Sequence, residues 1–218
     1  MEKSMKKIAL SLALVLGLAL ATASTASAKD MSNRMGIGAD STFGWTAGGA
    51  TATTGNPDMT SALPTQGLSI VYNVSKMFGI QLILGAGFGS ASDDANDYSA
   101  NGFGLAVRGI IPIAFTNDVN LGAVVGFSFL SASYSTTVQA SNTTTDLSGS
   151  WLAFDLGIRP EWFITEHFSI HTQIGVSLSL IGENDFGPFL PDSGGSGVAF
   201  SIFNNPDFLG QAGWTFYF

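Results

Sequence analysis

Residues His167–Leu180, HFSIHTQIGVSLSL, alternate between two kinds of side chain with a period of two. One set is apolar except for Thr172 and comprises Phe168, Ile170, Ile174, Val176, Leu178 and Leu180. The other set is polar or small and comprises His167, Ser169, His171, Gln173, Gly175, Ser177 and Ser179. Successive side chains of a β-strand point to opposite faces, whereas a helix would mix the two sets. The stretch therefore predicts a strand with one apolar and one polar face.

The same alternation recurs along most of the chain. It is clear in Trp151–Trp162 and is also found in six further segments: Arg34–Trp45, Gln66–Val74, Phe78–Gly89, Gly102–Ile113, Val119–Ser131 and Phe208–Phe218. Each of the eight segments has 9–14 residues, which is enough for a tilted strand to cross a bilayer. The sequence therefore predicts eight membrane-length strands.

Short and long connections alternate between these segments. The short ones are Ser75–Met77, Ala114–Asp118 and Ile164–Glu166, and the long polar ones are Thr46–Thr65, Ser90–Asn101, Ala132–Ser150 and Ile181–Asp207. Short periplasmic turns and long outer loops are typical of outer-membrane barrels. Val198–Phe203 also has a strand pattern, and we interpret it as an outer extension of the last strand pair. Counted as a separate strand, it would place the C-terminus outside the cell.

The charges separate the two faces. Charged residues make up only 11% of the chain, against about 25% in soluble domains. No charge falls at an outward position of the eight segments, whereas the inward positions hold Asp40, Arg108, Asp155, Arg159 and Glu161. A soluble sandwich would instead bury its apolar side. The predicted fold class is therefore all-β, an eight-stranded antiparallel up-and-down transmembrane β-barrel.

The five inward charges are the candidate site. Eight strands leave an interior just wide enough for side chains, and buried charges need partners. Arg108 and Arg159 are therefore predicted to pair with the carboxylates of Asp40, Asp155 and Glu161 in an ion network that fills the lumen. Pro112 and Pro160 interrupt strands, and both lie near the predicted periplasmic rim. A bulge at Pro160 would change the phase of Glu161.

The N-terminus has the form of a secretory signal peptide. Three lysines precede a short apolar run: Lys3, Lys6, Lys7, then Ile8–Leu20. Ala26 and Ala28 form an A-x-A cleavage site, so residues 1–28 are predicted to be removed and residues 29–218 to form the barrel. The mature chain would carry 5 basic and 15 acidic residues, which argues against a nucleic-acid partner. The chain has no cysteine, and therefore no disulfide framework.

The C-terminus ends in a pattern of polar, small and aromatic residues: Gln211, Gly213, Trp214, Phe216 and Phe218. It resembles the C-terminal signal that is read by the outer-membrane barrel assembly machinery, and Gln211, Gly213, Phe216 and Phe218 fill its slots. Together with the eight strands, the chain resembles the eight-stranded outer-membrane β-barrel superfamily. That superfamily includes the transmembrane domain of outer membrane protein A and the outer membrane protein X and W families. The resemblance implies a bacterial outer-membrane location and recognition by the assembly machinery.

Two motifs suggest other chemistry and are better explained by the barrel. Gly85–Gly89 and Gly36–Gly38 resemble phosphate loops, but no helix pattern follows them, and small lumen-facing residues explain them. His167 and His171 lie four residues apart on a strand, roughly 13 Å at about 3.3 Å per residue. That separation is too long for one metal ion. We therefore expect no metal, no cofactor and no enzymatic activity.

The predicted function is a structural or surface-interaction role in the outer membrane, with a side-chain-filled lumen. The first alternative is a narrow channel for small or apolar solutes, like the outer membrane protein W type, and an outer-membrane enzyme is the third. The expected partners are outer-membrane lipid, lipopolysaccharide and the barrel assembly machinery, and the expected state is a monomer. A continuous lumen path would favour the channel, whereas a plugged lumen favours the structural role.

Overall fold

The computed structural model describes residues 31–41, 67–92, 94–184, 195–202 and 211–218. Its strands are β1 Met35–Asp40, β2 Gly67–Ser75, β3 Phe78–Ser92, β4 Asn96–Phe115, β5 Val119–Val138, β6 Thr143–Phe163, β7 Phe168–Asn184, β8 Gly195–Ile202 and β9 Gln211–Tyr217. No helix in the described part of the chain is long and apolar enough to cross a membrane. The predicted signal peptide, residues 1–28, lies outside the described residues.

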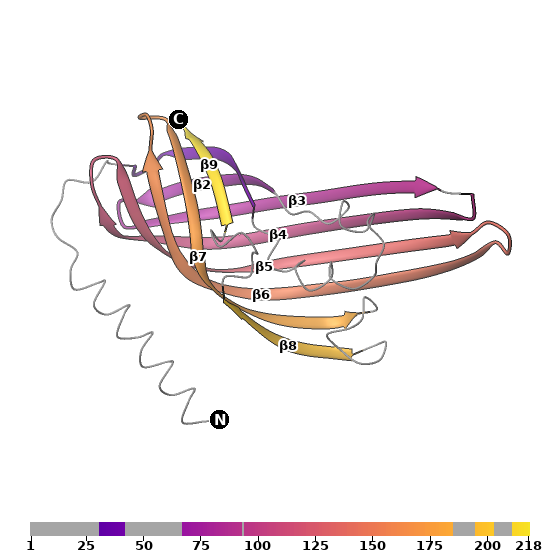
Figure 1. The fold of residues 1–218 in the computed structure, drawn as a ribbon. Coiled ribbons are helices and arrows are strands. Elements are labelled where there is room, and N and C mark those ends of the chain that lie inside the picture. Colours follow the sequence, from indigo (N-terminus) through magenta and orange to yellow (C-terminus); the bar gives the residue numbers. More distant parts are fainter. Residues whose placement is uncertain (1–30, 42–66, 93, 185–194, 203–210) are drawn as a thin grey trace, which may run out of the picture.

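The strands close into one antiparallel ring (Figure 1). Consecutive strands pair from β1 through β7, and β1 pairs with β9 to complete the circle. The closing contact matches Gly38 with Thr215 and Asp40 with Gly213. This closure removes the open sheet edges and satisfies the backbone within the ring, which a strand structure in lipid requires. The ring has eight strand positions, so the prediction of an eight-stranded barrel is confirmed.

The eighth position is occupied by two strands, both antiparallel to β7. The first half of β7 pairs with β9, from Phe168 opposite Phe216 to Gln173 opposite Gln211. The second half pairs with β8, from Val176 opposite Ile202 to Asn184 opposite Gly195. Residues 198–202 of the ambiguous segment therefore extend the last strand pair, as interpreted from the sequence, and Phe203 lies outside the described residues.

Two of the predicted long loops are instead mostly strand. Ser90–Asn101 and Ala132–Ser150 continue the ladders of two hairpins almost to their tips. The β5–β6 pairing reaches Val138 opposite Thr143, and Asn142 at the tip has a φ of 51°. The polar, Ser- and Thr-rich composition of these stretches predicts loops. Their hydroxyl side chains nevertheless alternate, and cross-strand Thr and Ser pairs stabilise a ladder.

The two strand prolines behave differently. The β4–β5 register shifts between Pro112 and Ala114, so a bulge accommodates the missing donor there. At Pro160 the register is the same on both sides, with Ile158 opposite Ile174 and Glu161 opposite His171. The phase of β6 is therefore preserved, and Glu161 stays on the inward side.

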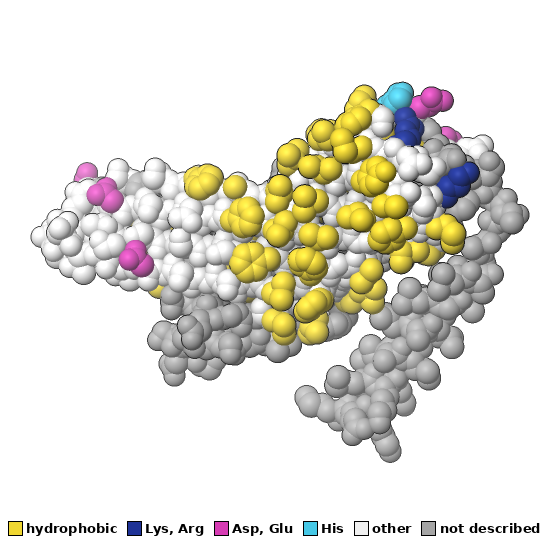
Figure 2. Space-filling model, turned by 180° about the vertical axis from the view of Figure 1, so that it is seen from behind, with side chains coloured by type: hydrophobic (Ala, Val, Ile, Leu, Met, Phe, Trp, Pro, Cys, Tyr) yellow, Lys and Arg dark blue, Asp and Glu magenta, His cyan; other side chains and the backbone are white. Residues whose placement is uncertain are grey.

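The outward side chains around the half of the barrel nearest the short turns form an apolar belt. One of its rows crosses five strands at Leu82, Val107, Phe127, Phe154 and Leu178. Along β6 the belt runs from Leu152 to Trp162, about 33 Å along the strand, and a tilt of about 40° reduces this to about 25 Å. That is the height of the apolar band of outer-membrane barrels. Figure 2 shows hydrophobic side chains gathered over this half of the molecule.

Beyond the belt, four strands continue as a projecting sheet, which we call the wing. It comprises Ala86–Ser92, Asn96–Phe103, Ser131–Val138 and Thr143–Ser150. These parts of β3–β6 extend well past the shorter strands β1, β2 and β9 (Figure 1). The wing is largely free of hydrophobic side chains on the face seen in Figure 2, and acidic residues lie near its tip.

The polarity of the sheet reverses where the belt meets the wing. In the belt, apolar side chains point outward, and the inward side chains are mainly polar or small. Around the wing, the inward side chains form a buried cluster of Leu130, Ala132, Tyr134 and Trp151, with Tyr98 packed against it. The outward positions there are mainly Ser and Thr. An apolar interior with a polar exterior is the arrangement of a protein in water, so the row of Phe129 marks the edge of the acyl-chain layer.

Candidate functional site

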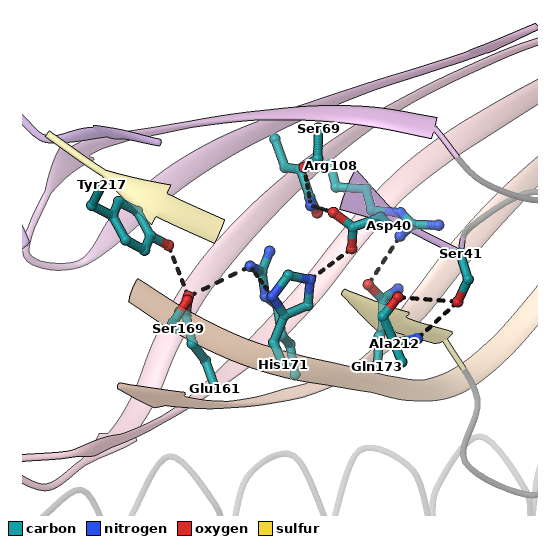
Figure 3. A network of polar contacts seen from close by, with 12 residues as sticks. Asp40, Ser41, Ser69, Arg108, Glu161, Ser169, His171, Gln173, Ala212 and Tyr217 are labelled. Carbon is teal, nitrogen blue, oxygen red and sulfur yellow. Dashed lines mark hydrogen bonds and ion pairs between the residues drawn. The ribbon is translucent and has the colours of Figure 1, made fainter. Parts of the chain in front are cut away.

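The lumen within the belt holds two neighbouring groups of buried polar side chains (Figure 3), beside buried apolar side chains such as Ile83 and Val124. At its centre, Arg108 Nη2 lies 3.0 Å from Asp155 Oδ2, and the two side chains are 0% and 1% exposed. Arg108 Nη1 also donates to Gln173 Oε1 at 3.0 Å, and Ser177 Oγ donates to Asp155 Oδ1 at 3.0 Å. These contacts come from β4, β6 and β7, so they tie opposite parts of the ring together across the lumen.

A second group surrounds Asp40 on β1. His171 Nε2 lies 2.6 Å from Asp40 Oδ1, and Gln81 Nε2 donates to Asp40 Oδ2 at 2.9 Å. Arg159 Nη2 lies 3.1 Å from His171 Nδ1. Because a guanidinium can only donate, Nδ1 must accept, and the ring proton lies on Nε2, where it points at Asp40. The geometry thus assigns a neutral His171 that donates to a carboxylate and accepts from an arginine.

Glu161 completes the group on the side of the short turns. Its Oε1 accepts hydrogen bonds from Ser169 Oγ at 2.6 Å and from Tyr217 Oη at 2.8 Å. Arg159 Nη2 lies 3.7 Å from the same oxygen, so this ion pair is looser than the pair of Arg108 and Asp155. The carboxylate is therefore held mainly by two hydroxyl donors, with the arginine charge beside it.

The structure places all five predicted lumen charges inside the ring, but the partners differ from a simple set of arginine–carboxylate pairs. Arg108 meets Asp155 and Arg159 meets Glu161, whereas the close partners of Asp40 are His171 and Gln81. Sequence reasoning left out several uncharged members of the group: Ser69, Gln81, Ser169, His171, Gln173, Ser177 and Tyr217. Their signal was the same period-two alternation, which puts them on the inward face.

A small cavity of about 40 Å³ lies between this group and the short turns. Its lining includes Asn73, Asn120 and Arg159. Within the described residues, Arg159 Nε and Nη1 and Asn120 Oδ1 have no hydrogen-bond partner. The cavity has room for about two or three waters, and apolar Ile110, Pro112 and Phe163 share its lining with the polar side chains. The side chain of Arg159 borders this cavity and is only 1% exposed, so the polar side chains of the lumen begin at the inner wall of the cavity.

The two histidines lie in different surroundings. His171 is buried in the lumen, whereas His167 is exposed at the turn-side rim, where its Nδ1 lies 3.0 Å from Arg34 Nη2. No group of three or more His, Cys, Asp or Glu within the described ranges is arranged to hold a metal ion. His167 therefore belongs to a rim contact and His171 to the lumen group.

The C-terminal residues form the strand that closes the ring. Trp214, Phe216 and Phe218 are each about half exposed and point outward at the turn-side margin of the belt, where aromatic girdles lie. Gly213 lies inward, beside the bond between Asp40 and His171. A Cβ on Gly213 would lie 2.6 Å from Asp40 Oδ1 and still closer to His171 Nε2. Lumen packing is thus a reason for glycine at this position that is independent of recognition by the assembly machinery.

We expect Gly213→Ala to destabilise the refolded barrel by about 1–3 kcal/mol, the usual cost of an added methyl group in a packed interior. The control is Gly109→Ala, whose Cβ would face outward and meet the ring of Phe78 at 3.2 Å, where the phenyl group can move into lipid. Unfolding by urea in detergent or lipid, without the assembly machinery, measures both variants. Equal midpoints for the two variants would show that Gly213 does not support the lumen group.

The apolar belt, the closed ring and the polar lumen define a membrane-spanning eight-stranded β-barrel. Neither a protein-family model nor a curated protein matches the amino-acid sequence. The fold is similar to solved outer-membrane proteins at low sequence identity. The attachment invasion locus protein Ail of Yersinia pestis is 11% identical, with 86% of this chain and 100% of that chain covered and a TM-score of 0.46. A major outer membrane protein of Thermus thermophilus is 13% identical, with coverage of 85% and 98% and a TM-score of 0.47. The N-terminal β-barrel domain of Pseudomonas aeruginosa OprF is 16% identical, with coverage of 87% and 100% and a TM-score of 0.34.

Proposed function

We propose that the chain is an integral barrel of a bacterial outer membrane with a structural or surface-interaction role and a closed lumen. The observation that carries this proposal is the buried layer of Arg108, Asp155, Asp40 and His171, which spans the ring within the belt. Each of these side chains reaches a partner on another strand. A solute would have to break several buried hydrogen bonds and an ion pair to pass. We further propose that the protein acts without a catalytic step.

The lengths of the connections support an orientation with the wing outside the cell and the short turns in the periplasm. The predicted mature chain has only five cationic residues: Lys29, Arg34, Lys76, Arg108 and Arg159. Two of them lie in the lumen, and Arg34 and Lys76 lie at the end with the short turns. Long outer hairpins and short periplasmic turns are the rule for outer-membrane barrels. We also propose removal of residues 1–28 on export and assembly through the C-terminal strand.

The channel remains the second candidate, and the turn-side cavity is the observation that favours it. This cavity extends to Arg159. The path to the other side then meets the bonds between Arg159, His171 and Asp40, and next the pair of Arg108 and Asp155. A channel would therefore require these side chains to separate.

Cysteine labelling in intact cells tests the proposed orientation, and the chain has no cysteine of its own. Gln139→Cys at the wing tip should react with a membrane-impermeant maleimide. Lys76→Cys at a short turn should react only after the outer membrane is permeabilised. If Lys76→Cys labels in intact cells and Gln139→Cys does not, the wing faces the periplasm and a surface role is excluded.

A further inference from the structure

The outer face of the wing is a regular array of short hydroxyl side chains. Four rows cross β3, β4, β5 and β6 above the belt, and ten of their sixteen positions are Ser or Thr. The rows are Ala86–Phe103–Ser131–Ser150, Phe88–Asn101–Ser133–Ser148, Ser90–Ser99–Ser135–Asp146 and Ser92–Asp97–Thr137–Thr144. None of the sixteen positions is Lys or Arg. The face is therefore polar but almost uncharged.

Neighbouring side chains within this face hold one another in place. Ser133 Oγ donates to Asn101 Oδ1 at 3.0 Å, and Ser135 Oγ donates to Asp146 Oδ1 at 2.6 Å. The Oγ1 atoms of Thr137 and Thr144 lie 3.0 Å apart. A hydroxyl offers one donor and two acceptor sites, so acceptor sites remain on this array after these contacts. Short side chains on a sheet also lose little conformational entropy when they bind a partner.

The position of the face restricts what can lie against it. The outward face of the same strands passes without a break from the apolar row of Phe129 to the hydroxyl rows, so the layer next to the wing begins where the acyl chains end. From Phe129 to Val138 the strand is about 30 Å long, which a tilt of about 40° reduces to a height of about 23 Å. The polar layer of a phospholipid leaflet is only about 5–8 Å deep, so most of the wing stands above it.

The chemistry of the face restricts the possible binding partner further. Solvated sheet faces usually carry many charged residues, and a phosphate-binding face would carry Lys or Arg. Asp97 and Asp146 would instead repel phosphate. A face that pairs with another protein needs an apolar core, and here the large apolar side chains are Phe88 and Phe103, both at the edge next to the belt. Hydroxyl rows with aromatic rings at their base are suited to uncharged sugars, which offer hydroxyls for hydrogen bonds and C–H faces for ring contact.

We propose that the outer face of the wing binds the neutral sugar units of the glycolipid in its own outer leaflet. This inference rests on the proposed outward orientation of the wing. Hydrogen bonds from the rows of Ser133, Ser135 and Thr137 hold the sugars, and Phe88 and Phe103 contact them next to the acyl chains. The barrel is thereby fixed in the sugar layer as well as in the lipid.

The test uses refolded full-length mature protein with a dye on Ser90→Cys, which lies on the outer face at β3. Three kinds of vesicle are compared: phospholipid alone, phospholipid with a glycolipid that carries a neutral oligosaccharide, and phospholipid with the same lipid lacking its sugars. Iodide quenching of the dye should be largely lost only in the vesicles with the oligosaccharide. The variant Ser133→Ala/Ser135→Ala/Thr137→Val should remain quenched there. The control Thr136→Val/Thr145→Val, on the other face of the same two strands, should behave like the parent protein.

Several outcomes would overturn the proposal. Protection that survives in the triple variant would show that the hydroxyl rows do not bind the sugars. Protection by soluble oligosaccharide in phospholipid vesicles would assign the face to a free glycan. Protection that rises with protein density in phospholipid alone would indicate a second copy of the chain. Quenching in all three kinds of vesicle, with Gln139→Cys still labelled on intact cells, would reject the sugar contact and leave the proposed function standing.

Discussion

Arg108→Ala should lower the stability of the refolded barrel by about 3–5 kcal/mol, the usual cost of removing one partner from a buried ion pair. The substitution leaves Asp155 charged and buried, and it also takes a donor from Gln173. The double variant Arg108→Ala/Asp155→Ala should recover part of the loss, because the uncompensated charge is then gone. Denaturant midpoints in lipid vesicles measure the effect.

Arg34→Ala is the matched control for this experiment. Arg34 lies at the turn-side rim, where it donates to the carbonyl of Glu166 at 3.0 Å. Exposed contacts of this kind are worth about 0–1 kcal/mol. If Arg108→Ala and Arg34→Ala have the same small effect, the lumen around Arg108 is hydrated, and the closed-lumen proposal fails.

Val125→Arg should cost about 2–4 kcal/mol, because it puts a charge on the lipid face near the middle of the apolar belt, four residues from Phe129 and six from Val119. Ser133→Arg makes a comparable change eight residues further along the same strand and on the same outward side, but within the wing. Its effect should be close to zero, since surface substitutions in water usually change stability by less than about 0.5 kcal/mol. Unfolding midpoints in the same vesicles compare the two variants. A large loss for Ser133→Arg would place the membrane edge inside the wing and contradict the boundary at Phe129.

The strand pattern could be predicted because its cause is local. Alternation along His167–Leu180 is set by the pleat and by the two media on either side of the wall, so one sequence is enough to show it. The strands of the wing could not be predicted from this alternation, for a related reason. In Ser131–Val138 the outward side chains are polar, so this stretch lacks the apolar outward face that predicts a membrane strand. Above the belt the outer face meets water and the inner face is packed, so the apolar side chains of the alternation, such as Ala132 and Tyr134, point inward.

The lumen contacts could be predicted only in part. The alternation of side chains along each strand places Asp40, Arg108 and Glu161 inside the ring. It does not determine which residues of different strands lie at the same height in the lumen. The bond between Asp40 and His171 joins residues 131 positions apart and depends on the stagger of β1, β9 and β7. That stagger is set by closure of the whole ring. His171 was therefore recognised as inward but not as the partner of a carboxylate.

The conductance of refolded protein in a planar bilayer tests the closed lumen most directly. The closed lumen predicts no discrete openings for the parent protein, because the layer of Arg108, Asp155, Asp40 and His171 blocks the ring within the belt. It also predicts that Arg108→Ala/Asp155→Ala, which removes the central pair, shows openings more often than the parent. Frequent, uniform openings of the parent protein would contradict the closed lumen and make the narrow channel the better account.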